Sequence, residues 1–215
     1  MNRRNLVIFT GLGAAALFAG GAFYYARQSR PPERPAIAMR EGLVRDHSPV
    51  IGPKDAPVTI VEFFDPACES CRAFYPVVKQ IMAMHSGDVR LVLRYAAFHQ
   101  GSDVAVGIIE AARKQDRFER VLEALLEKQP EWASHHAPNL DAAWAIAAGA
   151  GLDVTRARQD IVPAELAKIL EQDMEDIRTL QVTGTPTFFV NGKSPDSFGP
   201  EPLLQLVQSE VAAAR

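Results

Sequence analysis

The sequence predicts an α/β fold in which a short central strand leads directly into a helix and a helical subdomain is inserted further along the chain. Residues 58–64 are β-branched or aromatic with a single exception, which is typical of a strand buried on both faces. After Cys71 the apolar residues recur at helical spacing. Residues 185–192 return to strand composition and end in Asn-Gly, a pair that favours a two-residue hairpin turn.

The composition is that of a globular protein with a sizeable core. Of 215 residues, 47% are hydrophobic and 23% are charged. The net charge is −3, but basic residues are concentrated before His47, so the remainder of the chain is more acidic than this value suggests. An acidic domain argues against nucleic acid as a partner.

The N-terminal part of the chain predicts a membrane segment followed by a linker. Residues 6–26 carry no charge and, as a helix rising about 1.5 Å per residue, would cross a hydrocarbon core of roughly 30 Å. We expect residues 1–26 to be a signal anchor in the inner (cytoplasmic) membrane, with a cleaved signal peptide as the alternative. The prolines and arginines of residues 27–47 predict an extended linker. Residues 48–215 then form a domain that we expect to be periplasmic or otherwise extracytoplasmic.

Within the domain, the predicted order of elements is strand, helix, strand, helices, hairpin and helix. Residues 48–57 carry three prolines and predict an arm without regular structure. The central strand over 58–64 ends at an Asp-Pro pair, and the helix follows. Residues 88–95 resemble a second strand, and helical periodicity then dominates an insertion of about 101–181.

Several details of the second half can also be predicted. Asn139 is a suitable N-cap for a helix of the insertion. The acidic run of residues 171–176 is interpreted as a solvated helix face. A partner strand of the hairpin is expected from Lys193 towards Phe198, and Pro200 suits the first turn of a last helix.

The Cys-x-x-Cys pair at the start of the first helix carries the predicted chemistry. Unpaired N–H groups and the helix dipole favour an anion there, so Cys68 should lose its proton more readily than an ordinary thiol. Cys71, one turn further on, can close a disulfide with it. Half of a zinc site uses the same spacing, but no histidines of this chain stand at the paired spacing that zinc needs, and we expect no metal. A purely structural disulfide is the other alternative.

With these residues in view, the chain resembles the thioredoxin superfamily, and most closely its DsbA-like branch of extracytoplasmic thiol–disulfide oxidoreductases. The resemblance covers roughly residues 48–213. It rests on residues 55–65, the Cys-Glu-Ser-Cys motif, the helical insertion and residues 182–192. It implies a thioredoxin-like fold with an inserted helical subdomain.

The resemblance also implies roles for individual residues. Cys68 would be the nucleophile, Cys71 the resolving thiol and Glu62 the buried acid beneath the pair. Pro186 would be the cis-proline that faces the cysteines, and Thr185 would offer a strand-like edge to a substrate peptide. Between its cysteines this chain has Glu-Ser, where the best-known strong oxidant of the family has Pro-His, so a milder oxidant is expected.

The implied function is disulfide exchange with exported cysteine-containing proteins, in the oxidase rather than the isomerase or reductase direction. A membrane redox partner of the DsbB or DsbD type would be needed, no cofactor is implied, and we expect a monomer. Two alternatives remain, a Cu(I)-binding thioredoxin-like module and a noncatalytic scaffold. The Thr185-Pro186 pair favours the oxidoreductase over the metal module, and the presence of both cysteines argues against a scaffold. His99 and the other histidines are interpreted as solvated or satisfied in the core.

Overall fold

The structure is a computed structural model, and it describes residues 42–134 and 136–215. In this part of the chain, four strands form one mixed sheet: β1 (Val50–Ile51), β2 (Val58–Phe64), β3 (Val89–Tyr95) and β4 (Thr187–Val190). The order across the sheet is β1-β3-β2-β4. Strands β2 and β3 are parallel, while β1 and β4 are antiparallel to their neighbours. β2 is therefore central, and every one of its residues is buried, as predicted.

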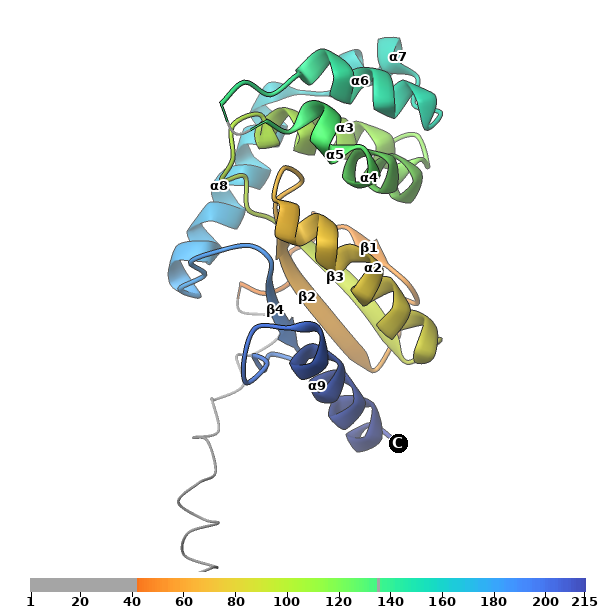
Figure 1. The fold of residues 1–215 in the computed structure, drawn as a ribbon, viewed down its shortest axis with the longest axis vertical. Coiled ribbons are helices and arrows are strands. Elements are labelled where there is room, and N and C mark those ends of the chain that lie inside the picture. The colour runs from red at the N-terminus through yellow and green to blue at the C-terminus, as the bar shows by residue number, and fades with distance from the viewer. Residues whose placement is uncertain (1–41, 135) are drawn as a thin grey trace, which may run out of the picture. The chain divides into compact units, whose positions relative to one another are not determined.

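The helices gather in two places, along the sheet and at one end of it (Figure 1). In the described residues they are α2 (Glu69–Met84), α3 (Ser102–Arg113), α4 (Phe118–Glu127), α5 (Gln129–Trp132), α6 (Leu140–Gly149), α7 (Val154–Asp160), α8 (Pro163–Thr179) and α9 (Pro200–Ala213). Helices α3 to α8 make up the insertion between β3 and β4. The predicted N-cap Asn139 is confirmed, because its side chain accepts a hydrogen bond from the Ala142 N–H. The last helix begins at Pro200, also as predicted.

The alternation of side chains along β2 divides the core between the two faces of the sheet. Ile60 and Phe64 pack in the larger cluster, with residues of α2 and α9. Val61 and Phe63 pack in a smaller cluster, with residues of α8. Glu62 has the same parity as Ile60 and Phe64, so the two-residue period of a strand directs its carboxyl group towards the α2 face. The central strand thereby places an acid under the helix that begins at the cysteines.

Two short segments differ from the sequence-based expectation. Asn191 and Gly192 adopt φ values of 47° and 82°, as the predicted turn requires. The predicted partner strand over residues 193–198 is wrong, since the described chain forms an isolated bridge at Lys193 and no strand beyond it. Pro195 has no N–H to donate to a ladder, which explains the early end. The arm before the sheet contains regular structure after all, because β1 pairs with β3.

The acidic run of α8 is only in part the solvated face that the sequence predicts, because Glu171 and Glu175 are exposed but the two aspartates are not. Asp173 is fully buried, and Asp176 is 4% exposed. Both carboxylates accept hydrogen bonds from Nη2 of the buried Arg94 on β3, at 2.7 and 2.6 Å. A buried charge is costly unless it is paired. These two aspartates therefore belong to a tertiary ion-pair network.

The last residues of the predicted linker pack against this network. Leu43 is fully buried on the α8 side of the sheet. Arg45 binds Asp176 with two hydrogen bonds, from Nε at 2.8 Å and from Nη2 at 2.6 Å. The carbonyl of Gly42 accepts a hydrogen bond from Arg94. The packed domain thus begins at least as early as residue 42.

The predicted anchor, residues 6–26, lies outside the described residues, and so does most of the predicted linker. In the part of the chain that the structure does describe, no helix is long and apolar enough to cross a membrane.

Candidate active site

Cys68 occupies the N-cap of α2, as the sequence predicts. Its N–H donates to the carbonyl of Asp65 at 3.1 Å, and its own carbonyl accepts a hydrogen bond from the Arg72 N–H, also at 3.1 Å. Cys71 lies in the first turn of α2 and is fully buried, whereas Cys68 is 7% exposed. Both thiols are free, so the structure shows the reduced pair with Cys68 as the more accessible sulfur.

The two thiols ionise very differently although they are close in sequence. The pKa of Cys68 is lowered to about 5, chiefly by a hydrogen bond from the Cys71 side chain. Partial burial opposes this lowering of the pKa, whereas the N–H groups of Ser70 and Cys71 contribute to the lowering. The pKa of Cys71 is raised far above its ordinary value by burial, by its hydrogen bond to Cys68 and by the charge of Glu62. At neutral pH, Cys68 is a thiolate and Cys71 is a thiol that stabilises it.

The segment before β4 lies against the nucleophile. The peptide bond between Thr185 and Pro186 is cis. Cys68 Sγ lies 3.3 Å from the carbonyl oxygen of Thr185, which accepts a hydrogen bond from the sulfur only while Cys68 is a protonated thiol, and the two residues are 117 positions apart. Antiparallel pairing of β4 with β2 brings this segment to the site. The structure therefore gathers the residues that the resemblance singles out, and their roles in binding a substrate stay predictions.

Glu62 lies in the fully buried interior, and neither of its carboxyl oxygens has a hydrogen-bond partner among the described residues. Burial, with a contribution from the charge of Cys68, raises the pKa of Glu62 to about 8. A group with this pKa is mostly protonated at neutral pH and can still release its proton near that pH. Its charged form also raises the pKa of Cys71, which means that the two groups interact. The placement agrees with the resemblance, and a role in proton transfer stays a prediction.

Asp65 is a site residue that the sequence analysis treats only as the end of a strand. Its main-chain N–H donates to Cys71 Sγ at 3.4 Å. Its fully buried carboxylate accepts five hydrogen bonds, from the N–H groups of Ala67 (2.9 Å), Phe98 (2.9 Å) and His99 (3.0 Å), from His99 Nδ1 (2.7 Å) and from the Ser102 hydroxyl. The signal that could have found it is the parallel pairing of β2 and β3, because parallel strands end at the same edge of a sheet. Asp65 thus joins the loop after β3 to the loop that carries Cys68.

Gln129 is a second residue that sequence reasoning missed. It is buried on α5, and its Nε2 donates to the carbonyls of Pro66 at 2.8 Å and Cys68 at 3.0 Å. Nothing local in the sequence marks it, because Gln129 stands 63 positions after Pro66 and 61 positions after Cys68. The helical insertion therefore holds the active-site loop directly.

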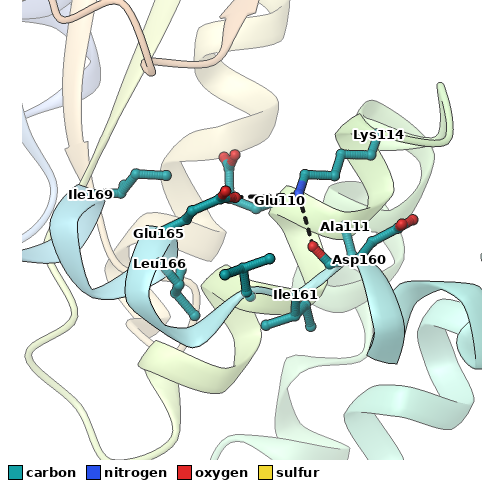
Figure 2. A pocket seen from close by; sticks show the side chains of 10 residues that line it. Glu110, Ala111, Lys114, Asp160, Ile161, Glu165, Leu166 and Ile169 are labelled. Carbon is teal, nitrogen blue, oxygen red and sulfur yellow. Dashed lines mark hydrogen bonds and ion pairs between the residues drawn. The ribbon is translucent and has the colours of Figure 1, made fainter.

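A small cavity lies away from the cysteines, between α3 and the chain that runs from α7 into α8 (Figure 2). It measures about 50 Å³ and has an apolar floor. At its rim, Lys114 Nζ donates to the Asp160 carbonyl at 2.7 Å and lies 3.7 Å from Glu165. Small-molecule sites usually measure roughly 300–1,000 Å³, so this cavity is too small to be one. Within residues 42–134 and 136–215, no group of three or more His, Cys, Asp or Glu side chains could hold a metal ion.

Known proteins resemble this chain over most of its length. The family model described as thioredoxin matches residues 45–209. Disulfide bond formation protein D of Bacillus subtilis is 31% identical over 166 residues, which cover 70% of this chain and 70% of that protein. A thioredoxin-like oxidoreductase from Silicibacter pomeroyi DSS-3 is 30% identical with a TM-score of 0.68, covering 82% of this chain and 99% of the other. BdbD from Bacillus subtilis is 27% identical with a TM-score of 0.67, covering 77% and 93%.

Other relatives carry a different name. The protein called Na(+)/H(+) antiporter NhaA 3 of Salinispora tropica is 33% identical over 199 residues, which cover 85% of this chain but 28% of that protein. The chain spans less than a third of such relatives, so the similarity concerns one segment of them. The family match, in contrast, extends over nearly the whole described domain. The chain therefore belongs to the thioredoxin superfamily, within its DsbA-like branch of thiol–disulfide oxidoreductases.

Proposed function

We propose that this chain exchanges disulfides with exported cysteine-containing proteins and acts as an oxidase. The observation that carries the proposal is the state of Cys68, a sulfur at a helix N-cap with a pKa of about 5 that lies against the Thr185 carbonyl. Stabilising the thiolate stabilises the reduced pair, which makes the oxidised pair a stronger oxidant. The names of the Bacillus subtilis and Silicibacter pomeroyi relatives support the same chemistry.

The reaction needs both cysteines in the oxidised state at the outset. A substrate thiolate attacks the sulfur of Cys68, a disulfide forms between the two proteins, and Cys71 leaves as a thiolate that takes up a proton. A second substrate thiolate then attacks the substrate sulfur of this mixed disulfide and releases Cys68 as a thiolate. Two electrons pass from the substrate to the cysteine pair. We assign the proton for Cys71 to Glu62, and the edge that the substrate peptide lies against to Thr185 and Pro186.

The reduced pair must then be reoxidised by another protein. We assign this step to a membrane redox partner of the DsbB or DsbD type. The proposal places the domain outside the cytosol, where a cysteine pair can persist in its oxidised form. Residues 6–26 would hold it, as a monomer, at the inner membrane.

Trapping of substrates tests this function. In Cys71→Ala the Cys68 thiolate can still form a mixed disulfide by attacking a disulfide of a substrate, which releases the other substrate sulfur as a thiolate. The thiol that would break this mixed disulfide by attacking Cys68 is gone. We expect the full-length variant to accumulate covalent adducts with exported proteins in cells. Non-reducing gels should show these adducts as high-mass bands that disappear when a reductant is added.

The double variant Cys68→Ala/Cys71→Ala is the matched control, because it lacks the nucleophile and should form no adducts. Folded and exported Cys71→Ala without reducible adducts would contradict the proposal. A Cu(I)-binding module would instead lose metal in Cys71→Ala without gaining adducts, and a noncatalytic scaffold would show neither change.

A further inference from the structure

Asp65 connects an imidazole to the nucleophile. The carboxylate of Asp65 accepts hydrogen bonds from the main-chain N–H of His99 at 3.0 Å and from its Nδ1 at 2.7 Å. Because a carboxylate only accepts, the contact assigns the proton to Nδ1. The carbonyl of Asp65, in turn, accepts from the N–H of Cys68 at 3.1 Å. One residue thus fixes the ring of His99 and the start of α2 relative to each other.

The redox motif itself contains no positive charge. The residues between the cysteines are Glu69 and Ser70, and Glu69 stands in the first turn of α2. A negative charge next to Cys68 opposes its ionisation. The loop after β3 brings His99 to the site, and its charged form interacts with both Cys68 and Glu69.

We propose that His99 in its charged form is a positioning residue of the redox centre, held by Asp65 so that it offsets the charge of Glu69 and stabilises the Cys68 thiolate. This inference rests on the function proposed above and deepens it. His99 acts through Cys68 and is not itself a catalytic residue. Its side chain is 28% exposed, so solvent can exchange its proton.

The ionisation of His99 agrees with this placement. Partial burial opposes its charged form, but the hydrogen bond to Asp65 and the negative charges of Asp65, Cys68 and Glu69 outweigh burial and raise the pKa of His99 above its usual value. An interaction between two charges is mutual, so the imidazolium must lower the pKa of Cys68 in return.

Two further ionisable groups act on the nucleophile. Cys71 donates a hydrogen bond to the Cys68 sulfur, and Glu62 carries charge only when its pKa of about 8 is exceeded. Neither group belongs to the loop after β3. Replacing His99 therefore changes one charge near Cys68 and leaves these two groups in place.

The test compares His99→Gln with the wild type at a pH below and a pH above the pKa of His99. Glutamine can still donate to Asp65 but carries no charge. Loss of the positive charge in His99→Gln should raise the pKa of Cys68 by about half a unit, and this effect is present at about pH 6, where His99 of the wild type is charged. The equilibrium constant for reduction of the disulfide by glutathione should fall about threefold, which for a two-electron couple is about 15 mV. At a pH well above the raised pKa of His99, where the imidazole has lost its charge, the two proteins should converge.

His136→Gln, a change of an exposed histidine in the insertion, is the control and should match the wild type at both pH values. His99→Lys keeps a positive charge without the ring and should retain the wild-type equilibrium constant at about pH 6, which keeps the test open should His99→Gln fail to fold. The inference is overturned if His99→Gln matches the wild type at the lower pH, if it differs equally at both, or if folded His99→Lys has lost the wild-type value. Absence of any exchange with glutathione in the wild type would instead refute the proposed function.

Discussion

Three ionisable side chains lie together at the site, and their surroundings act on them in different ways. Cys68 keeps its charge because hydrogen bonds reach its sulfur, whereas burial favours the neutral forms of Cys71 and Glu62. The pKa of Glu62 is about 8 in the folded protein against 4.5 ordinarily. A raised pKa means that the stabilisation linked to this proton is fully present below about pH 4.5 and is lost as the pH rises through about 8.

Glu62→Gln should remove the loss of stability that accompanies deprotonation of Glu62, because glutamine does not ionise. Since one pKa unit corresponds to about 1.36 kcal/mol, the free energy of unfolding of the wild type should fall by up to about 5 kcal/mol relative to the variant as the pH rises through that range. Urea unfolding of both reduced proteins at about pH 5, 7 and 9 measures the difference. The lowered pKa of Cys68 makes stability rise with pH in both proteins, so its contribution largely cancels in the difference between them. If the free energies of unfolding of the two proteins changed with pH in parallel, folding would not raise the pKa of Glu62.

At the scale of elements, the start of α2 is held by its neighbours on two sides. Asp65 ties it to the loop after β3, and Gln129 ties it to α5. Helix α5 is a single turn of four residues. Its contribution is therefore the placement of one amide against the carbonyls of Pro66 and Cys68.

Gln129→Met should weaken this attachment while filling a similar volume. Two buried carbonyls lose a donor, and we expect a loss of about 1–2 kcal/mol in the free energy of unfolding, measured in urea. The amides of residues 66–72 should also exchange faster with solvent. Gln205→Met is the control, because Gln205 is exposed on α9 and its side chain donates to Glu201, and it should change stability by less than about 0.5 kcal/mol. Equal effects of the two substitutions would contradict a specific role for Gln129.

At the scale of the whole domain, the network around Arg94 joins three parts of the chain. Arg94 belongs to β3, Asp173 and Asp176 belong to α8, and the arm before β1 contributes Arg45. Burial opposes ionisation of Asp176, but the two arginines outweigh it and lower its pKa. The arm, the sheet and the insertion are therefore held by one set of charges.

Asp173→Asn should destabilise the domain strongly, because it leaves the fully buried Arg94 with less compensating charge. Removing one partner of a buried ion pair typically costs about 3–5 kcal/mol. Glu175→Gln, on the same helix, breaks an exposed pair with Arg178 and should cost less than about 1 kcal/mol. Urea unfolding measures both effects. A small effect of Asp173→Asn would mean that the stability of the domain does not depend on the pairing of Arg94 with Asp173.

Local patterns predicted the central part of this fold well. The bounds of the central strand coincide with β2, and Cys68 caps α2, because both depend on the composition of neighbouring residues. Contacts between distant segments could not be predicted in this way. The contacts of Asp65 with His99 and of Gln129 with Cys68 depend on which strand ends and helices meet. In the sequence, Asp65, His99 and Gln129 look like ordinary surface side chains.

The failed predictions share a physical cause. Asp173 and Asp176 stand in an acidic run, and only the buried guanidinium of another element makes them interior residues. The expected strand over residues 193–198 was inferred from the turn before it, but a turn does not ensure a ladder when the following residues offer few β-formers and a proline.

The position of Gly42 has a mechanical consequence. Gly42 and Leu43 lie on the α8 side of the sheet, whereas α2 packs on the other side. Tension applied through the N-terminal end would load the ion pairs of Arg94 before it reached the cysteines. A carrier or surface attached ahead of Gly42 would hold the domain from the α8 side of the sheet. The α2 side, where Cys68 lies, would then stay open to a partner.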